Sequence, residues 1–295
     1  MSNSDAQDRK PKADQAEDNA FFPSPYSLSQ YTSGTTDFGG ADYPNAYKGD
    51  KWKILVVLTG ERYLKLKNGE FFSTGNHPVE TDLPMMHLEK AGFEFDITTM
   101  SGYSAKFEKW AFPKDDAAVN NFQGRYQEKF RNPRSLDEVW GNGFTAETPY
   151  IGVFIPGGHG VLTDVPFSPT VGKVLRWAHE HKRYLITLCH GPSCMLAADI
   201  DKPKGTEYIY KGREIVVFPD ALDKGANLEM GYLPAPMAWL VGESLRAKGV
   251  ITLNKGITGE VHRDGLVLTG DSPLASNNLG KLAATTILAD PLLKA

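Results

Sequence analysis

The chain has 295 residues, of which 41% are hydrophobic and 11% aromatic, and its formal net charge at pH 7 is −4. This length is enough for one large α/β domain with a smaller domain attached. The charge provides no basic stripe for a phosphate backbone, so we expect no nucleic-acid partner. The apolar runs fall well short of a membrane span, and we therefore expect no membrane partner.

The N-terminal segment is polar and charged and lacks the apolar core of a signal peptide. We expect residues 1–20 to form a mobile tail. The chain contains 2 cysteines, Cys189 and Cys194, which lie on one predicted strand-to-helix unit and do not suggest a disulfide framework. Free thiols fit a reducing compartment, so we expect a cytoplasmic protein.

Strand-like apolar runs alternate with helix-like segments along most of the chain. The predicted strands cover residues 54–58, 95–98, 151–155, 184–188, 215–218, 250–253 and 266–269. The predicted helices cover residues 79–90, 169–181, 237–248 and 273–288. This order is typical of a parallel sheet with helices on both faces. We therefore predict a doubly wound, mostly parallel α/β sheet of the flavodoxin-like kind, with a second, smaller domain.

Two regions interrupt the alternation. Residues 21–50 are dense in aromatic residues, proline, glycine and serine, and residues 103–148 are a polar insertion between two predicted strands. Such an insertion is most simply a small domain or a lid. We predict an α/β core domain over residues 51–102 and 149–295, and a small accessory domain over residues 21–50 and 103–148.

Cys189 is the strongest candidate for a reactive residue. It follows the apolar strand 184–188 and precedes a Gly-Pro turn and a predicted helix. Free backbone N–H groups and the positive end of the helix dipole favour the thiolate at such a position. A buried, inert thiol is the alternative, and it is the interpretation that we give to Cys194.

His190 is a candidate base because it is adjacent to Cys189. Neighbouring residues at a turn often point apart, so the sequence leaves the orientation of the imidazole open. A third group is needed to orient it, and Asp220 and Asp223 are candidates by residue type.

Two further segments follow predicted strands and could meet Cys189 at the same sheet edge. Gly157 and Gly158 could bring backbone N–H groups close to a substrate as an oxyanion hole, although a tight turn would need the same residues. Glu80 lies in the first turn of the predicted helix 79–90, where the helix dipole favours a carboxylate. It becomes a catalytic acid or base if it contacts Cys189, and is otherwise a solvated cap.

Taken together, motifs spread over nearly the whole chain resemble the PfpI-like deglycase superfamily, whose members have a glutamine-amidotransferase-like fold. The matching segments are residues 16–23, 26–31, 72–78, 156–160, 188–192, 218–220 and 268–273. Within the superfamily the chain resembles the HchA-type group of heat-shock chaperones, which are also called glyoxalase III.

The resemblance implies a homodimer that acts without a cofactor. It implies conversion of the small dicarbonyl methylglyoxal to lactate, deglycation of early adducts on glycated protein, and holdase chaperoning of unfolded client proteins. Carried over by motif, Cys189 is the nucleophile, His190 its triad partner and Glu80 the facing carboxylate. The position of the triad acid in related sequences selects Asp223 over Asp220.

The metal site described for the group has two histidines and one glutamate. The resemblance places Glu89, Glu94 and Tyr126 at those positions, and only Glu94 matches in residue type. Zinc prefers neutral imidazole, whereas a phenol is a poor ligand unless it is deprotonated. We therefore expect that no zinc is required.

Two other functions compete with the enzymatic interpretation. A holdase could bind clients on exposed aromatic residues, for which the candidates are Tyr26, Tyr31, Phe38, Tyr43 and Tyr47. A Cys-His pair with an oxyanion hole also suits hydrolysis of peptides or amides.

Overall fold

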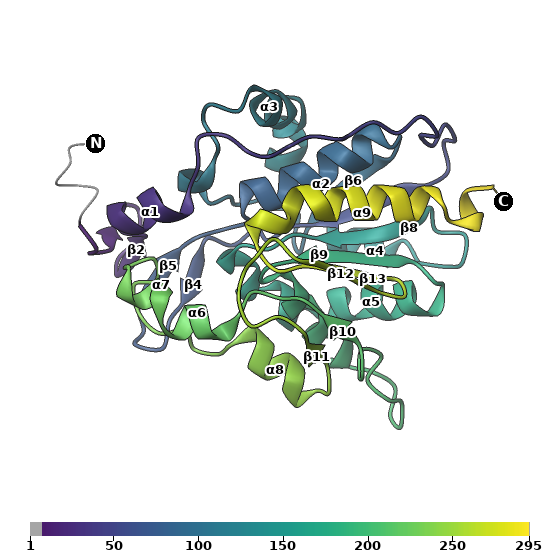
Figure 1. Cartoon of the computed structure of the whole chain (residues 1–295). Coiled ribbons are helices and arrows are strands. Elements are labelled where there is room, and N and C mark those ends of the chain that lie inside the picture. Colours follow the sequence, from purple (N-terminus) through teal and green to yellow (C-terminus); the bar gives the residue numbers. More distant parts are fainter. Residues whose placement is uncertain (1–7, 295) are drawn as a thin grey trace.

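A computed structural model describes residues 8–294 of the chain (Figure 1). Its centre is a 7-stranded sheet in which all neighbouring strands are parallel except the first pair, β12 and β13. In spatial order the strands are β12 (Val261–Asp264), β13 (Val267–Gly270), β9 (Tyr184–Leu188), β8 (Tyr150–Ile155), β3 (Lys53–Val57), β6 (Glu94–Thr99) and β7 (Arg134–Ser135). The predicted doubly wound, mostly parallel sheet is confirmed.

Helices cover both faces of this sheet. One face is packed by α2 (Pro78–Lys90) and α9 (Ser276–Leu288), which lie against each other, and α3 (Ala117–Arg131) packs outside α2. The other face is packed by α5 (Pro169–Glu180), with α4 (Leu136–Gly141) beside α5 and α8 (Val241–Ala247) further along. The layers therefore follow the order helix, sheet, helix.

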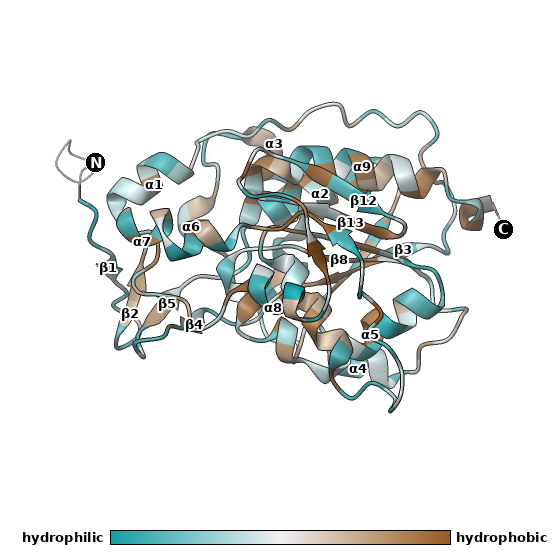
Figure 2. Ribbon diagram, turned by 60° about the horizontal axis from the view of Figure 1, so that its bottom comes forward, coloured by the Kyte–Doolittle hydropathy of each residue, from teal (hydrophilic) through white to brown (hydrophobic). Residues whose placement is uncertain are grey.

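The sequence of β3 shows why the sheet needs two helical layers. Ile54 and Val56 point into the core beneath α2 and α9, whereas Leu55 and Val57 point into the core beneath α5. Side chains alternate between the faces of a strand, so a run without polar residues must be buried on both. Figure 2 shows the same hydrophobic character in the central strand β8.

A smaller, 4-stranded sheet lies beside the central one and differs from the predicted accessory domain. Its order is β1 (Lys12–Ala13), β2 (Ala20–Phe22), β5 (Phe71–Ser73) and β4 (Tyr63–Lys65), and α1 (Pro25–Tyr31) follows β2. Part of the predicted mobile tail therefore forms paired strands, while residues 1–7 lie outside the described residues.

Two sequence-based placements differ from the structure. The insertion 103–148 supplies the edge strand β7 and helix α3 to the core, so it does not pair with the smaller sheet. The predicted strands 215–218 and 250–253 form a separate 2-stranded sheet, with β10 (Glu214–Ile215) parallel to β11 (Ile251–Thr252). Short apolar runs carry no information about which sheet they join.

Several short elements connect these layers and carry site residues. They are η2 (Lys109–Ala111), η3 (His159–Leu162), η4 (Val165–Phe167), η5 (Gly191–Asp199), α6 (Asp220–Lys224), α7 (Ala226–Glu229), η6 (Pro273–Ala275) and η7 (Pro291–Lys294). Over residues 8–294, none of the helices has both the length and the apolar character needed to cross a bilayer.

Phe154 tests the packing of the central strand. Its side chain is fully buried in β8, and we expect Phe154→Ala to lower the free energy of unfolding by about 3 kcal/mol or more because the core loses contacts and gains a cavity. Tyr103, which is 74% exposed, provides the control, since Tyr103→Ala should change stability by about 0.5 kcal/mol or less. Urea unfolding measures both. Equal effects of the two substitutions would contradict the described core.

Candidate active site

Cys189 sits at a sharp bend immediately after β9. Its φ of 56° is unusual for a residue with a side chain, and such strain is kept where the surrounding structure enforces it. The chain then enters η5, a 3-10 helix where the sequence predicted a helix without specifying its type. Gly191 permits the bend, because a Cβ there would lie 2.7 Å from the carbonyl oxygens of Ile155 and Pro156. The sulfur is thereby presented at the carboxyl edge of the sheet.

The imidazole of His190 points back to the sulfur. Nδ1 lies 3.3 Å from Sγ of Cys189, and Nε2 lies 2.8 Å from Oδ2 of Asp223. Because an ionised carboxylate only accepts hydrogen bonds, Nε2 must carry the ring proton, and Nδ1 of a neutral ring then offers a lone pair to the thiol. The sequence left the orientation of the His190 imidazole open, and the structure orients it so that it can act as a general base for Cys189. The structure also brings Asp223, and not Asp220, to this ring.

His159 joins this arrangement although the sequence analysis did not assign it a role. Its Nε2 lies 3.0 Å from Oδ1 of Asp223, and the amide of Asn227 donates to the same oxygen at 2.7 Å. Although burial opposes it, the two imidazoles lower the pKa of Asp223. Burial and the neighbouring His159 lower the pKa of His190, which Asp223 partly offsets, so His190 is neutral near pH 7. The sequence offered one signal for His159, namely its position directly after Gly157 and Gly158.

Glu80 and Cys189 lie side by side next to Gly157 and are both buried. Burial raises the pKa of Glu80 well above its ordinary value, although the neighbouring Cys189 and the Gly157 backbone partly offset this. Burial, and then Glu80, raise the pKa of the Cys189 thiol. Two negative charges side by side inside a protein are strongly disfavoured, so this pair keeps at least one proton. Glu80 therefore acts as a group of the site and is not a solvated cap.

Gly157 and Gly158 fill the space between these groups. A Cβ on Gly157 would collide with the carboxyl of Glu80 and lie 2.8 Å from Cβ of Cys189. Gly158 has a φ of 96°, and its backbone N–H points at Cys189 and lowers the pKa of the thiol. Backbone donors beside the nucleophile are the chemistry that an oxyanion hole needs.

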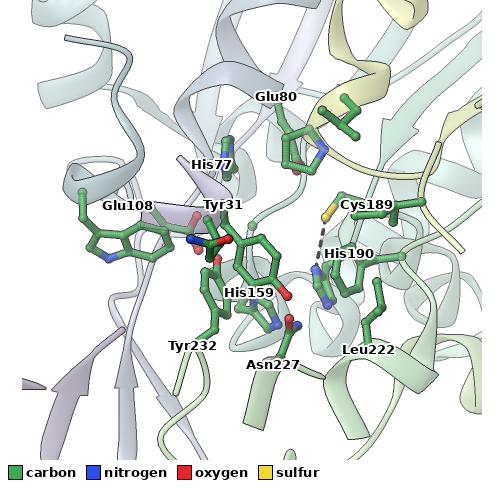
Figure 3. Close-up of a pocket in the computed structure, with 17 residues that line it drawn as sticks. Tyr31, His77, Glu80, Glu108, His159, Cys189, His190, Leu222, Asn227 and Tyr232 are labelled. Atoms are coloured by element: carbon green, nitrogen blue, oxygen red, sulfur yellow. Dashed lines mark hydrogen bonds between the residues drawn. The ribbon is translucent and has the colours of Figure 1, made fainter. Parts of the chain in front are cut away.

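One cavity of about 390 Å³, enclosed on several sides, is lined by Cys189, His190, Glu80 and Gly158 (Figure 3). Tyr31 at the end of α1 and Leu274 in η6 stand at its rim, where they are 38% and 60% exposed. Tyr232 is buried on the inner side. The site thus combines a nucleophile, a base and a carboxyl in a largely apolar pocket, which suits a small electrophilic substrate.

The residues at the expected metal positions do not fit zinc. Arg125 and Tyr126 both donate to the carboxylate of Glu89, at 2.5 and 3.0 Å. Burial and Glu89 raise the pKa of Tyr126, so its phenol is protonated and acts as a donor. Glu94 is paired with Lys53 at 3.2 Å, and its side chain is 78% exposed. Glu89 and Glu94 therefore each have protein partners, and the phenol of Tyr126 is a donor where zinc would require a ligand with a free lone pair.

A different set of residues has the spacing of metal ligands. Within residues 8–294, one group of donor atoms lies within 4.8 Å of one another, and it consists of His159, His190 and Asp223. Their closeness is explained by the two hydrogen bonds between the imidazoles and the carboxylate. A metal there would displace the proton that orients His190.

The aromatic residues proposed for client binding are mostly covered. Phe38 and Tyr43 pack around His87, and Tyr47 stacks on Phe93 with ring centroids 5.4 Å apart. Of the five candidates, Tyr31 alone is among the exposed large hydrophobic residues of the described chain, and it lies at the pocket. The segment around residues 38–47 therefore packs against the core.

Comparison with solved structures identifies the fold class. Glyoxalase III from Candida albicans matches with a TM-score of 0.61 and 20% sequence identity, covering 79% of this chain and 97% of that one. A ThiJ/PfpI domain protein from Brachyspira murdochii matches with a TM-score of 0.51 and 12% identity, over 81% and 98%. The chain thus has the DJ-1/ThiJ/PfpI fold, with its cysteine at the strand-end bend.

Comparison with curated proteins identifies the family. A protein/nucleic acid deglycase HchA from Pseudomonas aeruginosa is 57% identical over 288 residues, covering 98% of both chains. Its counterpart from Staphylococcus aureus is 49% identical over 280 residues, covering 95% of both. No family model matches the sequence. The chain belongs to the HchA deglycase family, as the motifs predicted.

The role of Asp223 is tested by the reactivity of the thiol. Asp223→Asn removes the charge that stabilises a protonated His190, so we expect alkylation of Cys189 by iodoacetamide at pH 7.5 to slow about tenfold or more. Asp220→Asn is the matched control, because Asp220 accepts from Arg246 and the Gly242 backbone outside the triad. Mass spectrometry of the modified cysteine measures both rates. Equal alkylation rates in the two variants would contradict a role of Asp223 in activating Cys189.

Proposed function

We propose that the protein is a glutathione-independent glyoxalase III that converts methylglyoxal to lactate, with a related protein deglycase activity. The observation that carries this proposal is the contact geometry of Cys189. Its sulfur is 3.3 Å from Nδ1 of His190, and it lies beside the buried Glu80 in the lining of the same pocket. Names of relatives add support, since HchA proteins are called deglycases and the Candida albicans neighbour is called glyoxalase III.

In the first step the sulfur of Cys189 attacks the aldehyde carbon of methylglyoxal. The thiol proton passes to Nδ1 of His190 and then to the aldehyde oxygen, which gives a neutral hemithioacetal. Backbone N–H groups near Gly158 stabilise the negative charge that develops on that oxygen. Asp223 stabilises the imidazolium while it holds the proton.

In the second step a proton moves from one substrate carbon to the next. Glu80 or His190 removes the hydrogen from the carbon bonded to sulfur, and the resulting enediolate is protonated on the neighbouring carbon. The product is a lactoyl thioester. A carboxyl whose pKa is raised by burial suits this transfer, because its carboxylate form is a stronger base.

In the third step water hydrolyses the thioester, releasing lactate and restoring the thiol of Cys189. The sum of the steps is methylglyoxal plus water giving lactic acid, so no electron acceptor is consumed. The deglycase activity uses the same first intermediate. For an adduct on an amine, the C–S bond forms as the C–N bond breaks, and the thiol proton goes to the departing nitrogen.

The two alternative functions remain predictions with different tests. Holdase activity would survive loss of the nucleophile, since apolar capture needs no thiol. Peptide or amide hydrolysis would use the Cys189–His190 pair without the proton transfer between carbons. Measurements of client aggregation and amine release from peptides separate both from lactate formation.

Replacement of the nucleophile tests the enzymatic proposal. Cys189→Ala should lower lactate formation from methylglyoxal about 1,000-fold or more, and Glu80→Gln about 100-fold, because the first removes the bond to substrate and the second the proton transfer. Cys194→Ala is the matched control, since that buried thiol lies in η5 outside the pocket lining. Lactate formation that persists in Cys189→Ala would discard the mechanism.

Metal removal tests the expectation that zinc is not required. Because Arg125 and Tyr126 already donate to Glu89, we expect lactate formation to be unchanged, within about twofold, after treatment with a chelator. Elemental analysis of the purified protein should give well under one zinc per chain. Stoichiometric zinc whose removal abolishes activity would show that the ligand argument is mistaken.

A further inference from the structure

The pocket contains buried polar atoms that the proposed chemistry does not use. Nδ1 of His77, Oε2 of Glu108 and Nε1 of Trp110 have no hydrogen-bond partner among the described residues, and all three side chains line the same pocket as Cys189. A buried polar atom left unpaired costs about 1–3 kcal/mol. Several such groups around one cavity indicate a ligand that supplies their partners.

Glu108 is the most informative of these groups. Its side chain is fully buried, and Oε1 accepts a hydrogen bond from the hydroxyl of Thr74 at 2.6 Å, which leaves Oε2 free. Among residues 8–294 no lysine or arginine forms an ion pair with it. Burial raises the pKa of Glu108 to about 7, although His159, Thr74 and the more distant charge of Arg62 partly offset this. A buried carboxyl that has one oxygen free and makes no direct ion pair is suited to receive a cation from the substrate.

The neighbouring side chains select the shape of that cation. Trp110 and Tyr232 pack edge to face with ring centroids 5.5 Å apart, and Tyr31 and Tyr232 pack edge to face at 5.4 Å. An aromatic face matches a planar guanidinium better than a compact, strongly hydrated ammonium. Figure 3 shows Glu108 and Cys189 on opposite sides of the pocket, with Tyr31 and Tyr232 between them. A substrate could therefore contact both ends at once.

We propose that Glu108 is a specificity-determining residue that selects adducts formed on a guanidinium group, such as a glycated arginine side chain. Its free Oε2 accepts a hydrogen bond from a guanidinium N–H while the carbon derived from the dicarbonyl reaches Sγ of Cys189. The proposal rests on the proposed function, because the same thiol must receive that carbon. A free dicarbonyl carries no positive charge and therefore does not use Glu108.

The decisive measurement compares two substrates in one variant. The methylglyoxal adduct of N-acetylarginine amide offers the guanidinium, and the adduct of N-acetylcysteine amide offers a neutral sulfur in its place. In Glu108→Gln we expect the ratio of kcat/KM for arginine over cysteine adduct to fall about tenfold, mainly through KM. Glu61→Gln, which removes an exposed carboxylate outside the pocket, should leave the ratio unchanged. An unchanged ratio in Glu108→Gln would overturn the proposal.

Wild-type protein provides a test that does not depend on the folding of the variant. Methylguanidinium should inhibit turnover of the arginine adduct competitively at a concentration about fivefold or more below that of methylammonium. Equal inhibition by the two cations would contradict selection of a planar group. The adduct of guanosine is uncharged, so its turnover should not depend on Glu108. A fall as large as that of the arginine adduct would show that positive charge is not what is selected.

The same assay distinguishes a failure of the proposed function from a failure of the role given to Glu108. If Cys189→Ala still turns over both adducts, the proposed function fails. If Cys189→Ala loses both adducts while Glu108→Gln keeps the wild-type ratio, the proposed function stands and the role given to Glu108 is wrong.

Discussion

A carboxyl and a thiol buried side by side cannot both be ionised, and the site is built around this constraint. Both groups are buried, and burial disfavours a second negative charge beside the first. The backbone of residue 157 passes between Glu80 and Cys189, and the space there admits only a glycine. The same constraint explains why the base is a neutral His190, whose proton is fixed on its far nitrogen by Asp223. The thiol can then ionise only as its proton leaves toward the base or the substrate.

The central fold and the nucleophile could be predicted from sequence because both depend on local pattern. Strand 184–188 was placed at its observed bounds, and the bend after it identified Cys189. The smaller sheet could not be predicted, since its strands are at most 3 residues long and join segments far apart in the chain. Short strands bury too little surface to leave a periodic signal.

Some residues of the candidate site could likewise be predicted from the sequence, and others could not. Asp223 was selected by family resemblance, because spacing alone gave Asp220 equal standing. His159 and Glu108 were missed as site residues, since they reach the pocket through tertiary contacts and not through a motif with its own chemistry. The residue types at the expected metal positions could be read from the sequence, but the pairing of Glu89 with Arg125 could not. Residue type can be read directly, whereas the choice of partner depends on the fold.

The rim of the pocket draws on both ends of the chain. Tyr31 belongs to the first helix, and Leu274 belongs to the segment just before the last long one. During synthesis the segment carrying Cys189 leaves the ribosome before residues 273 and 274 do. The enclosure around the sulfur is therefore completed late, and a nascent chain has a nucleophile that is still open to the cell's electrophiles.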